Sequence, residues 1–566
     1  MNSTTLNITV VSDELDHRES LLASIAAQQV FLAASFLAAC LFYAHHVSRS
    51  KASKLPLPPG PAGWPVIGNL LKYPDTRRWL TEYLWKFNYG PLVYLNILGK
   101  PMLILTTVEA THELLNKRAA KYSGRDLSVM AGDLVSKGYN LIFRQYDAQM
   151  RLHQRLNVAG LNPRSAALYD LVLRLESLQL LHDILTESRA RPDTEGHQTP
   201  TPTDMQTSRP FNPRWYFQRA NVGSLHVILY GDRLVKEDPT TAGKMDYLLT
   251  CPTLQALQNP PLVDTFPWLK SIPYALSPWK LRAESMFKEE EAYHLRNLRN
   301  AVNQPGYNVA KQVADSAKRL NMELSDTEIS WVIGTLFLAN GDTSPTFITW
   351  FLVMMINYPR VMHKAQQVLD EVVGRDRLPT HDDRARMPYI DAIIDEVMRY
   401  RPVVPSGVDH LSVEEDEYMG YRIPKGTIIV TSQFSLARDK AAFGVDAEEF
   451  RPERWLERND LPIIGFGNGR RVCPGRHVAK EILWIMVTRL LWAYEMEAPI
   501  DPETKKRKVI DDRDTVPVGI VIGPSPFEAV FTPRGKWVED IIENDFKNAD
   551  FDVNRIMEDV AVSKGL

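Results

Sequence analysis

The residues best suited to chemistry lie in the stretch 465–475, which reads GFGNGRRVCPG. Its alternating glycines could cradle a phosphate, and its cysteine could bind a metal. A dinucleotide-binding loop needs the pattern GxGxxG between a strand and a helix, and Arg470 stands where the third glycine is required. No GxxxxGK[ST] motif occurs near it. Phosphate binding is therefore disfavoured.

Metal binding would depend on Cys473 alone. A lone thiolate cannot complete a tetrahedral zinc site, but it can be the one protein ligand of a metal held by a porphyrin. Such a loop needs glycines for tight turns, a cation for the propionates and backbone N–H groups near the sulfur. The pattern FxxGxRxCxG supplies this set with Phe466, Gly469, Arg471, Cys473 and Gly475.

A second polar cluster, Ala339–Ser344 (ANGDTS), interrupts a long apolar segment. The segment opens with the capping box Ser325–Glu328 and continues to about Ile356, which predicts one long helix. Asn-Gly-Asp-Thr-Ser followed by Pro345 is unfavourable inside a helix, so we expect a local opening of the helical hydrogen bonds there.

Together these motifs resemble those of cytochrome P450, a family of heme-thiolate monooxygenases, and in particular its membrane-anchored fungal members. The resemblance covers roughly residues 55 to 534. It implies heme b with Cys473 as axial ligand. It also implies that Asp342 and Thr343 are the acid–alcohol pair that relays protons on the opposite side of the heme. Asn340 departs from the glycine usual in that motif.

The resemblance also assigns a structural network. Glu396 and Arg399 are three residues apart on a helix expected from about Tyr389 to Arg401, where such a pair is ordinarily a solvated contact. In the family the pair is buried and joined by a downstream arginine, matched here by Arg454. The network would hold the cysteine loop in place without taking part in the reaction.

The resemblance implies that Arg125, His410 and Arg471 bind the heme propionates. The family's WxxxR motif, which adds a tryptophan and an arginine, is replaced here by Met150 and Gln154. We expect Arg151 or Arg155 to compensate from the neighbouring turns.

The implied function is hydroxylation or epoxidation of a lipophilic small molecule with O2. Residues 332–343, 403–408 and 518–523 would line the substrate space by resemblance. No segment resembles a flavin or nicotinamide module, so electrons would come from a separate NADPH–P450 reductase, received near Arg470, Arg476 and Lys480. Two alternatives are a same-fold isomerase or dehydratase that needs no external electrons, and a non-catalytic heme sensor. The intact Asp342–Thr343 pair argues against both.

Composition restricts the setting. The chain has 566 residues, 44% of them apolar, and a net charge of -3, so charge gives no reason to expect a nucleic-acid partner. Three cysteines (Cys40, Cys251 and Cys473) are too few for a disulfide framework, which favours a reducing compartment. We expect Cys251 to be structural.

Residues 21–44 carry no charged side chain and are long enough to span a bilayer. Acidic residues precede them and Arg49, Lys51 and Lys54 follow, which places residues 1–20 in the lumen and the body in the cytosol. We therefore expect a single-pass protein of the endoplasmic reticulum membrane, with sequons at Asn2 and Asn7 on the lumenal side.

The sequence predicts one large, mainly helical P450 fold with small β-sheets after the N-terminal transmembrane helix. Residues 45–68 form a basic, proline-rich hinge, residues 69–534 the catalytic domain and residues 535–566 an acidic extension expected to be a solvated helix. A hairpin is expected at Val93–Thr107 and one long helix at Asn157–Ser188, whereas 191–213 reads as a surface loop. The proline-broken apolar segment Pro260–Pro273 is either a membrane-dipping patch or a buried loop.

Overall fold

A computed structural model describes residue 35 and residues 55–74, 76–126, 128–189, 208–234, 239–320, 322–518 and 521–565. Helices dominate, with one four-stranded sheet and three two-stranded sheets, which confirms the expected mainly helical fold with small sheets. Apart from residue 35, the anchor predicted at residues 21–44 lies outside the described residues, and so does 191–207 of the expected loop. No helix within the described ranges is both long and apolar enough to cross a bilayer.

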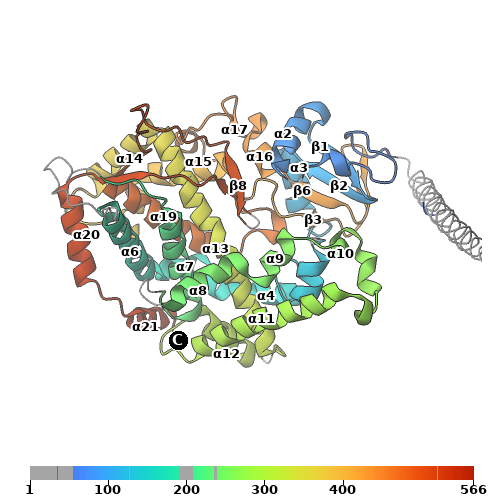
Figure 1. Cartoon of the computed structure of the whole chain (residues 1–566), viewed down its shortest axis with the longest axis horizontal. Helices are drawn as coiled ribbons and strands as arrows, with labels where there is room; N and C mark the ends of the chain where they lie inside the picture. Colours follow the sequence, from blue (N-terminus) through green and yellow to red (C-terminus); the bar gives the residue numbers. More distant parts are fainter. Residues whose placement is uncertain are drawn as a thin grey trace, which may run out of the picture.

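The helices surround α13, which passes through the middle of the molecule (Figure 1). Their bounds are α2 Arg78–Tyr89, α3 Val108–Thr111, α4 Ala148–Leu161, α5 Pro163–Leu168, α6 Asp170–Arg189, α7 Arg214–Tyr230, α8 Pro239–Thr250, α9 Pro252–Gln258, α10 Leu262–Thr265, α11 Pro278–Val302, α12 Val309–Arg319, α13 Asp326–Asn357, α14 Pro359–Val372, α15 Pro388–Tyr400, α16 Gln433–Ala437, α17 Lys440–Phe443, α18 Arg454–Glu457, α19 Arg476–Ala493, α20 Lys536–Asn548 and α21 Val553–Lys564. Two π-helical segments are η2 His112–Lys117 and η3 Val129–Val135.

The strands gather mainly at one end of the molecule, beside α2 and α3 (Figure 1). The four-stranded sheet has the order β1 Leu92–Ile97, β2 Lys100–Leu105, β6 Ile428–Thr431 and β3 His410–Leu411, and only the β2–β6 pair is parallel. The antiparallel pairs are β4 Asp416–Tyr418 with β5 Tyr421–Ile423, β7 Tyr494–Glu497 with β10 Val530–Pro533, and β8 Thr515–Val518 with β9 Val521–Pro524. The β1–β2 hairpin confirms the prediction, and its turn places Gly99 at φ 86°.

Helix α13 is the expected long helix. The hydroxyl of Ser325 accepts the Glu328 N–H at 3.1 Å, as a capping residue should. The Glu328 carboxylate does not complete the box, because it binds His153 Nε2 at 2.8 Å instead. The prediction that the helical hydrogen bonds open locally near Pro345 is wrong, because α13 is continuous through that residue.

The single helix expected at Asn157–Ser188 is also wrong, because the segment divides into α4, α5 and α6. Pro163 has no N–H to continue α4, and the side chain of Asn162 caps α5 by accepting the Ser165 N–H at 3.0 Å. The prediction of one helix was wrong because it relied on the apolar periodicity, which continues on both sides of this break.

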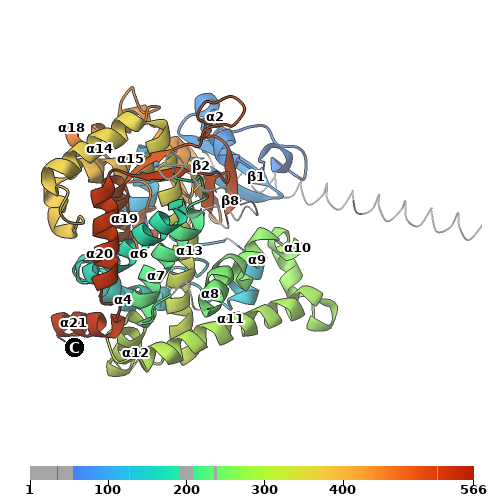
Figure 2. The same cartoon turned by 60° about the vertical axis from the view of Figure 1, so that its left-hand side comes forward.

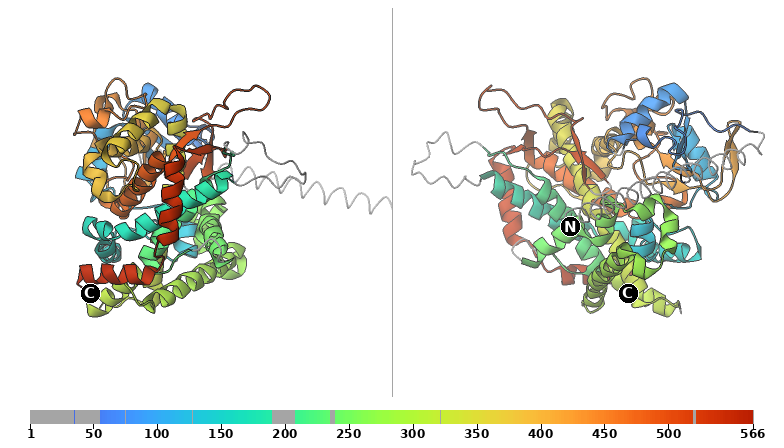
Figure 3. Two further views of the ribbon diagram at one scale, coloured as in Figure 1. Left: turned by 90° about the vertical axis from the view of Figure 1, so that its left-hand side faces the viewer. Right: turned by 45° about the vertical axis from the view of Figure 1, so that its right-hand side comes forward.

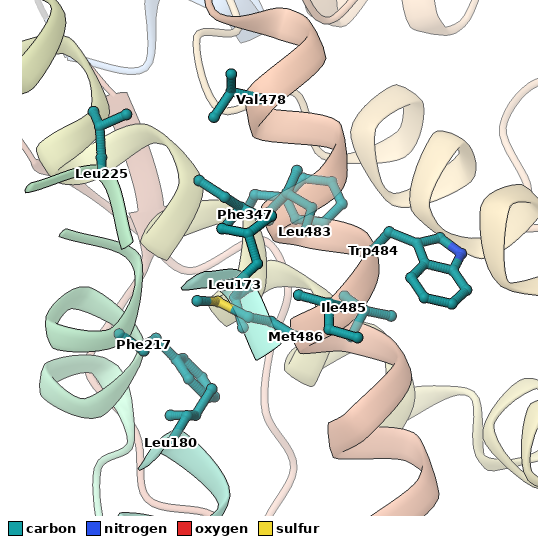
Figure 4. Packing of buried hydrophobic residues seen from close by; sticks show 14 of the residues in the cluster. Leu173, Leu180, Phe217, Leu225, Phe347, Val478, Leu483, Trp484, Ile485 and Met486 are labelled. Carbon is teal, nitrogen blue, oxygen red and sulfur yellow. The ribbon is translucent and has the colours of Figure 1, made fainter. Parts of the chain in front are cut away.

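The largest hydrophobic core forms where α19 lies against α6, α7 and α13. Leu483 and Met486 of α19 point toward Phe347 of α13 and Leu173 of α6, whereas Trp484 points to the other side of α19 (Figure 4). All five side chains are buried. This packing fixes α19, and the cysteine loop lies immediately before its first residue.

The extension at residues 535–566 is not a solvated helix. It forms α20 and α21, which run down one side of the body next to α6 and α12 (Figures 2 and 3). Val538, Ile542 and Met557 are buried against the core. The Met557 carbonyl accepts the Tyr307 N–H at 3.1 Å, and Lys564 Nζ donates to Ser165 Oγ at 2.7 Å. The acidic side chains lie on the outer face of these two helices. Because they dominate the composition of the segment, the composition did not indicate that its apolar side chains pack against the core.

Met557→Ala tests that the extension is part of the fold. Since Met557 is buried, we expect the free energy of unfolding to fall by about 2–4 kcal/mol, as measured by urea denaturation. Val562→Ala on the same helix is the control, because Val562 is 77% exposed and should change stability by less than about 0.5 kcal/mol. Equal midpoints for the two variants would show that α21 contributes nothing to folding.

Candidate active site

The cysteine loop is held by its own backbone and by η2. The Cys473 N–H donates to the Phe466 carbonyl at 2.9 Å, and the Gly469 N–H donates to Asn116 Oδ1 at 2.7 Å. Gly469 has a φ of 60°, and a Cβ there would lie 2.0 Å from the Leu115 carbonyl oxygen. Only glycine fits this position, which explains the glycine in the loop.

The half-buried Cys473 thiol lies just before α19, with Gly475 as the N-cap residue. Burial raises the pKa of the thiol, and the N–H groups of Gly475 and Arg476 together with the Arg476 charge oppose that rise. A helix N-terminus favours negative charge, so the loop partly prepares a thiolate.

Arg125, Arg471 and His410 come together between the cysteine loop and β3. Arg471 donates from Nε to the Ser123 carbonyl at 3.0 Å, and Arg125 donates from Nη1 to the Val408 carbonyl at 3.0 Å. Burial, and then the neighbouring Arg471 charge, lower the pKa of Arg125 to about 9. Burial also lowers the pKa of Arg471 to about 10.

His410 is neutral in this setting. Burial, and then the Arg125 charge, lower its pKa to about 3. Its Nδ1 is 2.8 Å from the Tyr122 carbonyl, which can only accept, so Nδ1 carries the proton. Within the described residues neither Arg125 nor Arg471 forms a salt bridge with a carboxylate. The buried guanidinium of Arg125 and the half-buried guanidinium of Arg471 therefore have no directly paired carboxylate, and the charges of Asp409 and Asp147 act on them only from a longer distance.

Asp342 and Thr343 lie midway along α13. The Thr343 hydroxyl donates to the Ala339 carbonyl at 3.1 Å and makes no hydrogen bond to Asp342. Asp342 is buried, with Arg214 Nη2 3.5 Å from its Oδ1. Burial raises the pKa of Asp342 to about 6, and the Arg214 charge opposes that rise. A carboxyl group with this pKa can gain and lose a proton near neutral pH.

The structure brings Glu396, Arg399 and Arg454 together in a buried network. Glu396 accepts from Arg399 Nη2 at 2.7 Å and from Arg454 Nε at 3.2 Å. It also accepts the Arg451 N–H at 2.7 Å and Trp455 Nε1–H at 2.9 Å. One carboxylate thus binds donors from α15 and from residues 451–455, which fixes α15 to the residues around α18.

A family model described as Cytochrome P450 matches residues 58–531 of the chain. The chain belongs to the cytochrome P450 family. It is 32% identical over 545 residues to cytochrome P450 monooxygenase FrzL of Cladobotryum sp, covering 96% of this chain and 99% of that relative. It is 34% identical over 518 residues to cytochrome P450 monooxygenase peniB of Penicillium patulum, covering 90% and 91%.

Because these fungal relatives are P450 monooxygenases and match nearly the whole chain, the chain is a P450 monooxygenase. The fold also matches a solved structure of a zebra fish cytochrome P450 with progesterone, with a TM-score of 0.66 and 22% identity over 81% of this chain and 100% of that one. At this identity the match shows the fold alone.

The family implies a thiolate-ligated heme, and the residues of this P450 fit that group. The Arg125 Nε–H is buried and has no hydrogen-bond acceptor. Two propionate carboxylates would provide acceptors for Arg125 and counter-charges for Arg471. A cationic iron at the Cys473 sulfur would favour the thiolate against the cost of burial.

The replaced propionate motif has other uses in this P450. Met150 is buried against Leu141 and Val332, and Gln154 donates from Nε2 to the Arg470 carbonyl at 3.0 Å, tying α4 to the cysteine loop. Arg151 and Arg155 are solvent-exposed, which does not support the expected compensation.

Sequence reasoning missed Arg214, Asn221 and Trp455. Arg214 and Asn221 reach α13 from α7, where Asn221 Nδ2–H donates to the Asn340 carbonyl at 3.1 Å. Arg214 and Asn221 lie too far from α13 in the sequence for a local motif or spacing to indicate these contacts. Trp455 is next to Arg454, so its contact with Glu396 could have been sought from adjacency.

Asp342→Asn tests the raised pKa. The pKa of Asp342 is about 6 in the folded protein and 3.8 in the unfolded chain. The protonated carboxyl group therefore stabilises the fold fully below pH 4, and this stabilisation is lost as the pH rises to about 6. The free energy of unfolding of Asp342→Asn should not decline over this pH range. At pH 7.5 the variant should be more stable than wild type by about 1–2 kcal/mol, which is less than the free energy equivalent to the pKa shift because Arg214 loses its partner. Urea unfolding at pH 4.5 and pH 7.5 measures the difference, with the exposed Asp376→Asn as control. Parallel pH profiles for wild type and Asp342→Asn would contradict the assignment.

Proposed function

We propose that this P450 monooxygenase hydroxylates or epoxidises a lipophilic small molecule in fungal secondary metabolism, with electrons from a separate NADPH–P450 reductase. The observation that carries the proposal is the presence of three kinds of group in one P450 fold. These are a thiol at the start of α19, a buried and a half-buried arginine that form no salt bridge with a carboxylate within the described residues, and a carboxyl group on α13 with a pKa near 6. Oxygen activation requires a metal ligand, a cofactor anchor and a proton source, and these groups match that set.

Heme, when bound, would supply the oxygen-activating redox chemistry. Cys473 would hold the heme iron through its sulfur, with its loop held by the Phe466 carbonyl and the thiolate favoured by the N–H groups at the start of α19. Phe466, Gly469 and Gly475 would shape the loop. Arg125 and Arg471 would bind the propionates, and His410 would join them through a protonated Nε2, a form that the propionate charge would favour. Glu396, Arg399 and Arg454 would keep the loop in position.

Proton delivery would fall to Asp342 and Thr343. Asp342 can exchange a proton near neutral pH, and Thr343 can pass one through its hydroxyl after turning from the Ala339 carbonyl. Arg214 lies on the side of Asp342 that faces α7, so the carboxyl group can bind the arginine or turn from it. The substrate would contact buried apolar residues of α13 such as Val332 and Leu336, which favours a lipophilic molecule.

The partner assignment has support from the surface. A groove of about 590 Å³ lies beside the cysteine loop, lined by Asn116, Lys117 and Arg470 among others. Of the three basic residues expected to receive the reductase, Arg476 donates to the Cys473 carbonyl at 3.1 Å and Lys480 lies 3.6 Å from Asp395. Arg470 is the exposed one, and we propose that it faces the reductase.

Membrane attachment has support from exposed apolar side chains. Leu262, Trp268 and Leu276 are largely exposed in the segment that precedes α11, so Pro260–Pro273 is not a buried loop. Such a patch can enter a membrane interface. We propose attachment to the endoplasmic reticulum membrane through this patch and residues 21–44, with the catalytic domain in the cytosol.

Reconstitution with a fungal P450 reductase, NADPH and isotopically labelled dioxygen tests the proposed activity. A panel of terpenoid, polyketide and aromatic compounds would be incubated and analysed by mass spectrometry. We expect a product that carries one labelled oxygen atom and forms only when reductase and NADPH are both present. The matched Asp342→Asn enzyme should yield less product for each NADPH oxidised.

The two alternatives give different results. An isomerase or dehydratase would form an unlabelled product without NADPH. A heme sensor would bind heme and form no product with any compound of the panel, even where a compound changes the heme spectrum. Either result would overturn the monooxygenase assignment for this chain.

A further inference from the structure

A second cavity, of about 590 Å³, lies where α7, α8 and α11 meet. None of the residues assigned to the heme, the proton relay or the reductase lines it. Aromatic and polar side chains from all three helices line the cavity, among them His226, Tyr230, Lys244, Tyr247, Tyr293 and Asn297. A volume of this size is typical of small-molecule sites.

Several polar groups of this cavity lack a well-formed hydrogen bond. The hydroxyls of Tyr230, Tyr247 and Tyr293 and the amide nitrogen of Asn297 are buried without one within the described residues, although the Asn297 side chain lies close enough to the hydroxyls of Tyr230 and Tyr293 to interact with them. Tyr230, Tyr293 and Asn297 are 3%, 7% and 7% exposed. A buried polar group left without a partner costs about 1–3 kcal/mol, so a molecule that hydrogen-bonds to these groups would be stabilised in the cavity.

The wall of the cavity is aromatic. Tyr247 and Tyr293 are stacked, with ring centroids 3.7 Å apart and planes at 17°. His226 Nδ1 lies 2.7 Å from the Asp232 carbonyl and therefore carries the proton, which leaves Nε2 as an acceptor. Burial, and then the Lys244 charge, lower the pKa of His226 to about 4, so the ring is neutral. These features favour a flat molecule with oxygen substituents.

The charged side chains around the cavity predict how a ligand would be oriented in it. Lys244 is paired with Asp232 at 3.2 Å, whereas Arg296 lies over the Tyr293 ring at 5.4 Å and forms no salt bridge within the described residues. The buried carboxylate of Glu290 lies six residues earlier on α11, about 9 Å along the helix, and accepts from Thr253 Oγ1 at 2.8 Å. A negative group on the ligand would therefore lie at Arg296, away from Glu290.

We propose that this cavity binds a planar aromatic carboxylic acid. Its ring system packs against the tyrosine wall, its carboxylate pairs with Arg296, and its oxygen substituents accept from the phenols and from Asn297. The site is independent of the proposed oxygenation, because none of its groups touches the heme site. It is nevertheless near α13, since a Cβ at Gly341 would lie 3.1 Å from Leu248 on the adjacent face of α8.

Calorimetric titration of hydroxynaphthoate into the full heme-loaded protein tests the site. The protein is first saturated with phenylimidazole, so that the heme pocket contributes nothing. We expect one binding event, weakened about tenfold by Tyr293→Phe and by Arg296→Gln. Arg282→Gln is the matched control, because Arg282 is an exposed arginine at the other end of α11 and should leave the affinity unchanged.

Naphthol, which lacks the carboxylate, should bind at least about tenfold more weakly. Absence of binding to the azole-saturated protein would overturn the proposal, and so would equal affinities of wild type and both variants. Equal binding of naphthol would overturn the assignment of a carboxylic acid. An unchanged heme spectrum in every variant separates these outcomes from a failure of the heme site itself.

Discussion

Cys473→Ala is expected to remove the strongly red-shifted Soret band of the reduced, carbon-monoxide-bound protein and to lower turnover by at least about 100-fold. That band requires a thiolate ligand, and Cys473 lies just before α19 in the same loop as Arg471, whose guanidinium forms no salt bridge with a carboxylate within the described residues. Loss of an outer contact to a metal ligand already costs about 10- to 100-fold in affinity or activity, so loss of the ligand should cost more. Difference spectra and heme content of the purified proteins measure the effect.

Cys251→Ala is the matched control. Cys251 is buried beside α9, and burial raises the pKa of its thiol far above the usual range, as for an inert structural cysteine. This variant should keep the red-shifted band. Loss of the band in both variants would point to general unfolding, and its persistence in Cys473→Ala would exclude the cysteine loop as the ligand-bearing segment.

Glu396→Gln is expected to destabilise the protein by about 3–5 kcal/mol and to reduce the heme retained after purification. The carboxylate accepts hydrogen bonds from Arg399, Arg451, Arg454 and Trp455. A glutamine amide is nearly the same size but places an NH2 group against these donors. It leaves the buried Arg399 without a counter-charge and leaves Arg454 paired with Asp446 alone. Urea unfolding followed by circular dichroism and by the Soret band measures the loss.

Glu457→Gln removes a surface carboxylate as a control. Glu457 is exposed and lies 2.6 Å from Arg451 Nη1, so its substitution should change stability by less than about 1 kcal/mol. Similar midpoints for Glu396→Gln and Glu457→Gln would mean that the buried network does not stabilise the fold.

The features that could be predicted from the sequence depend on residues close together in the chain. The cysteine loop, the β1–β2 hairpin and the Ser325 cap each involve fewer than about 15 residues, and turn chemistry and capping act over such distances. The Glu396–Arg399 pair is also local, and the family resemblance supplied Arg454. The roles of these residues toward heme remain predictions.

The features that could not be predicted depend on tertiary contacts. Arg214 approaches Asp342 only because α7 packs across α13, and nothing in the residues around Arg214 indicates that neighbour. The extension at 535–566 reads as acidic and solvated, because the buried Val538, Ile542 and Met557 are separated by charged residues. The break at Asn162–Pro163 was predictable from the proline, but the apolar periodicity on both sides outweighed it.

The parallel pairing of β2 with β6 has a consequence for how the chain folds. It joins Met102 to Ile428, about 330 residues later in the chain, and closing a loop of this length costs about 5 kcal/mol of entropy. The β1–β2 hairpin can form early from local contacts, but its free edge has no partner until β6 arrives. Folding should therefore be slow, and an unpaired strand edge is exposed to aggregation throughout that interval. Synthesis of the chain at reduced temperature, which weakens association of such apolar edges, should increase the yield of folded protein.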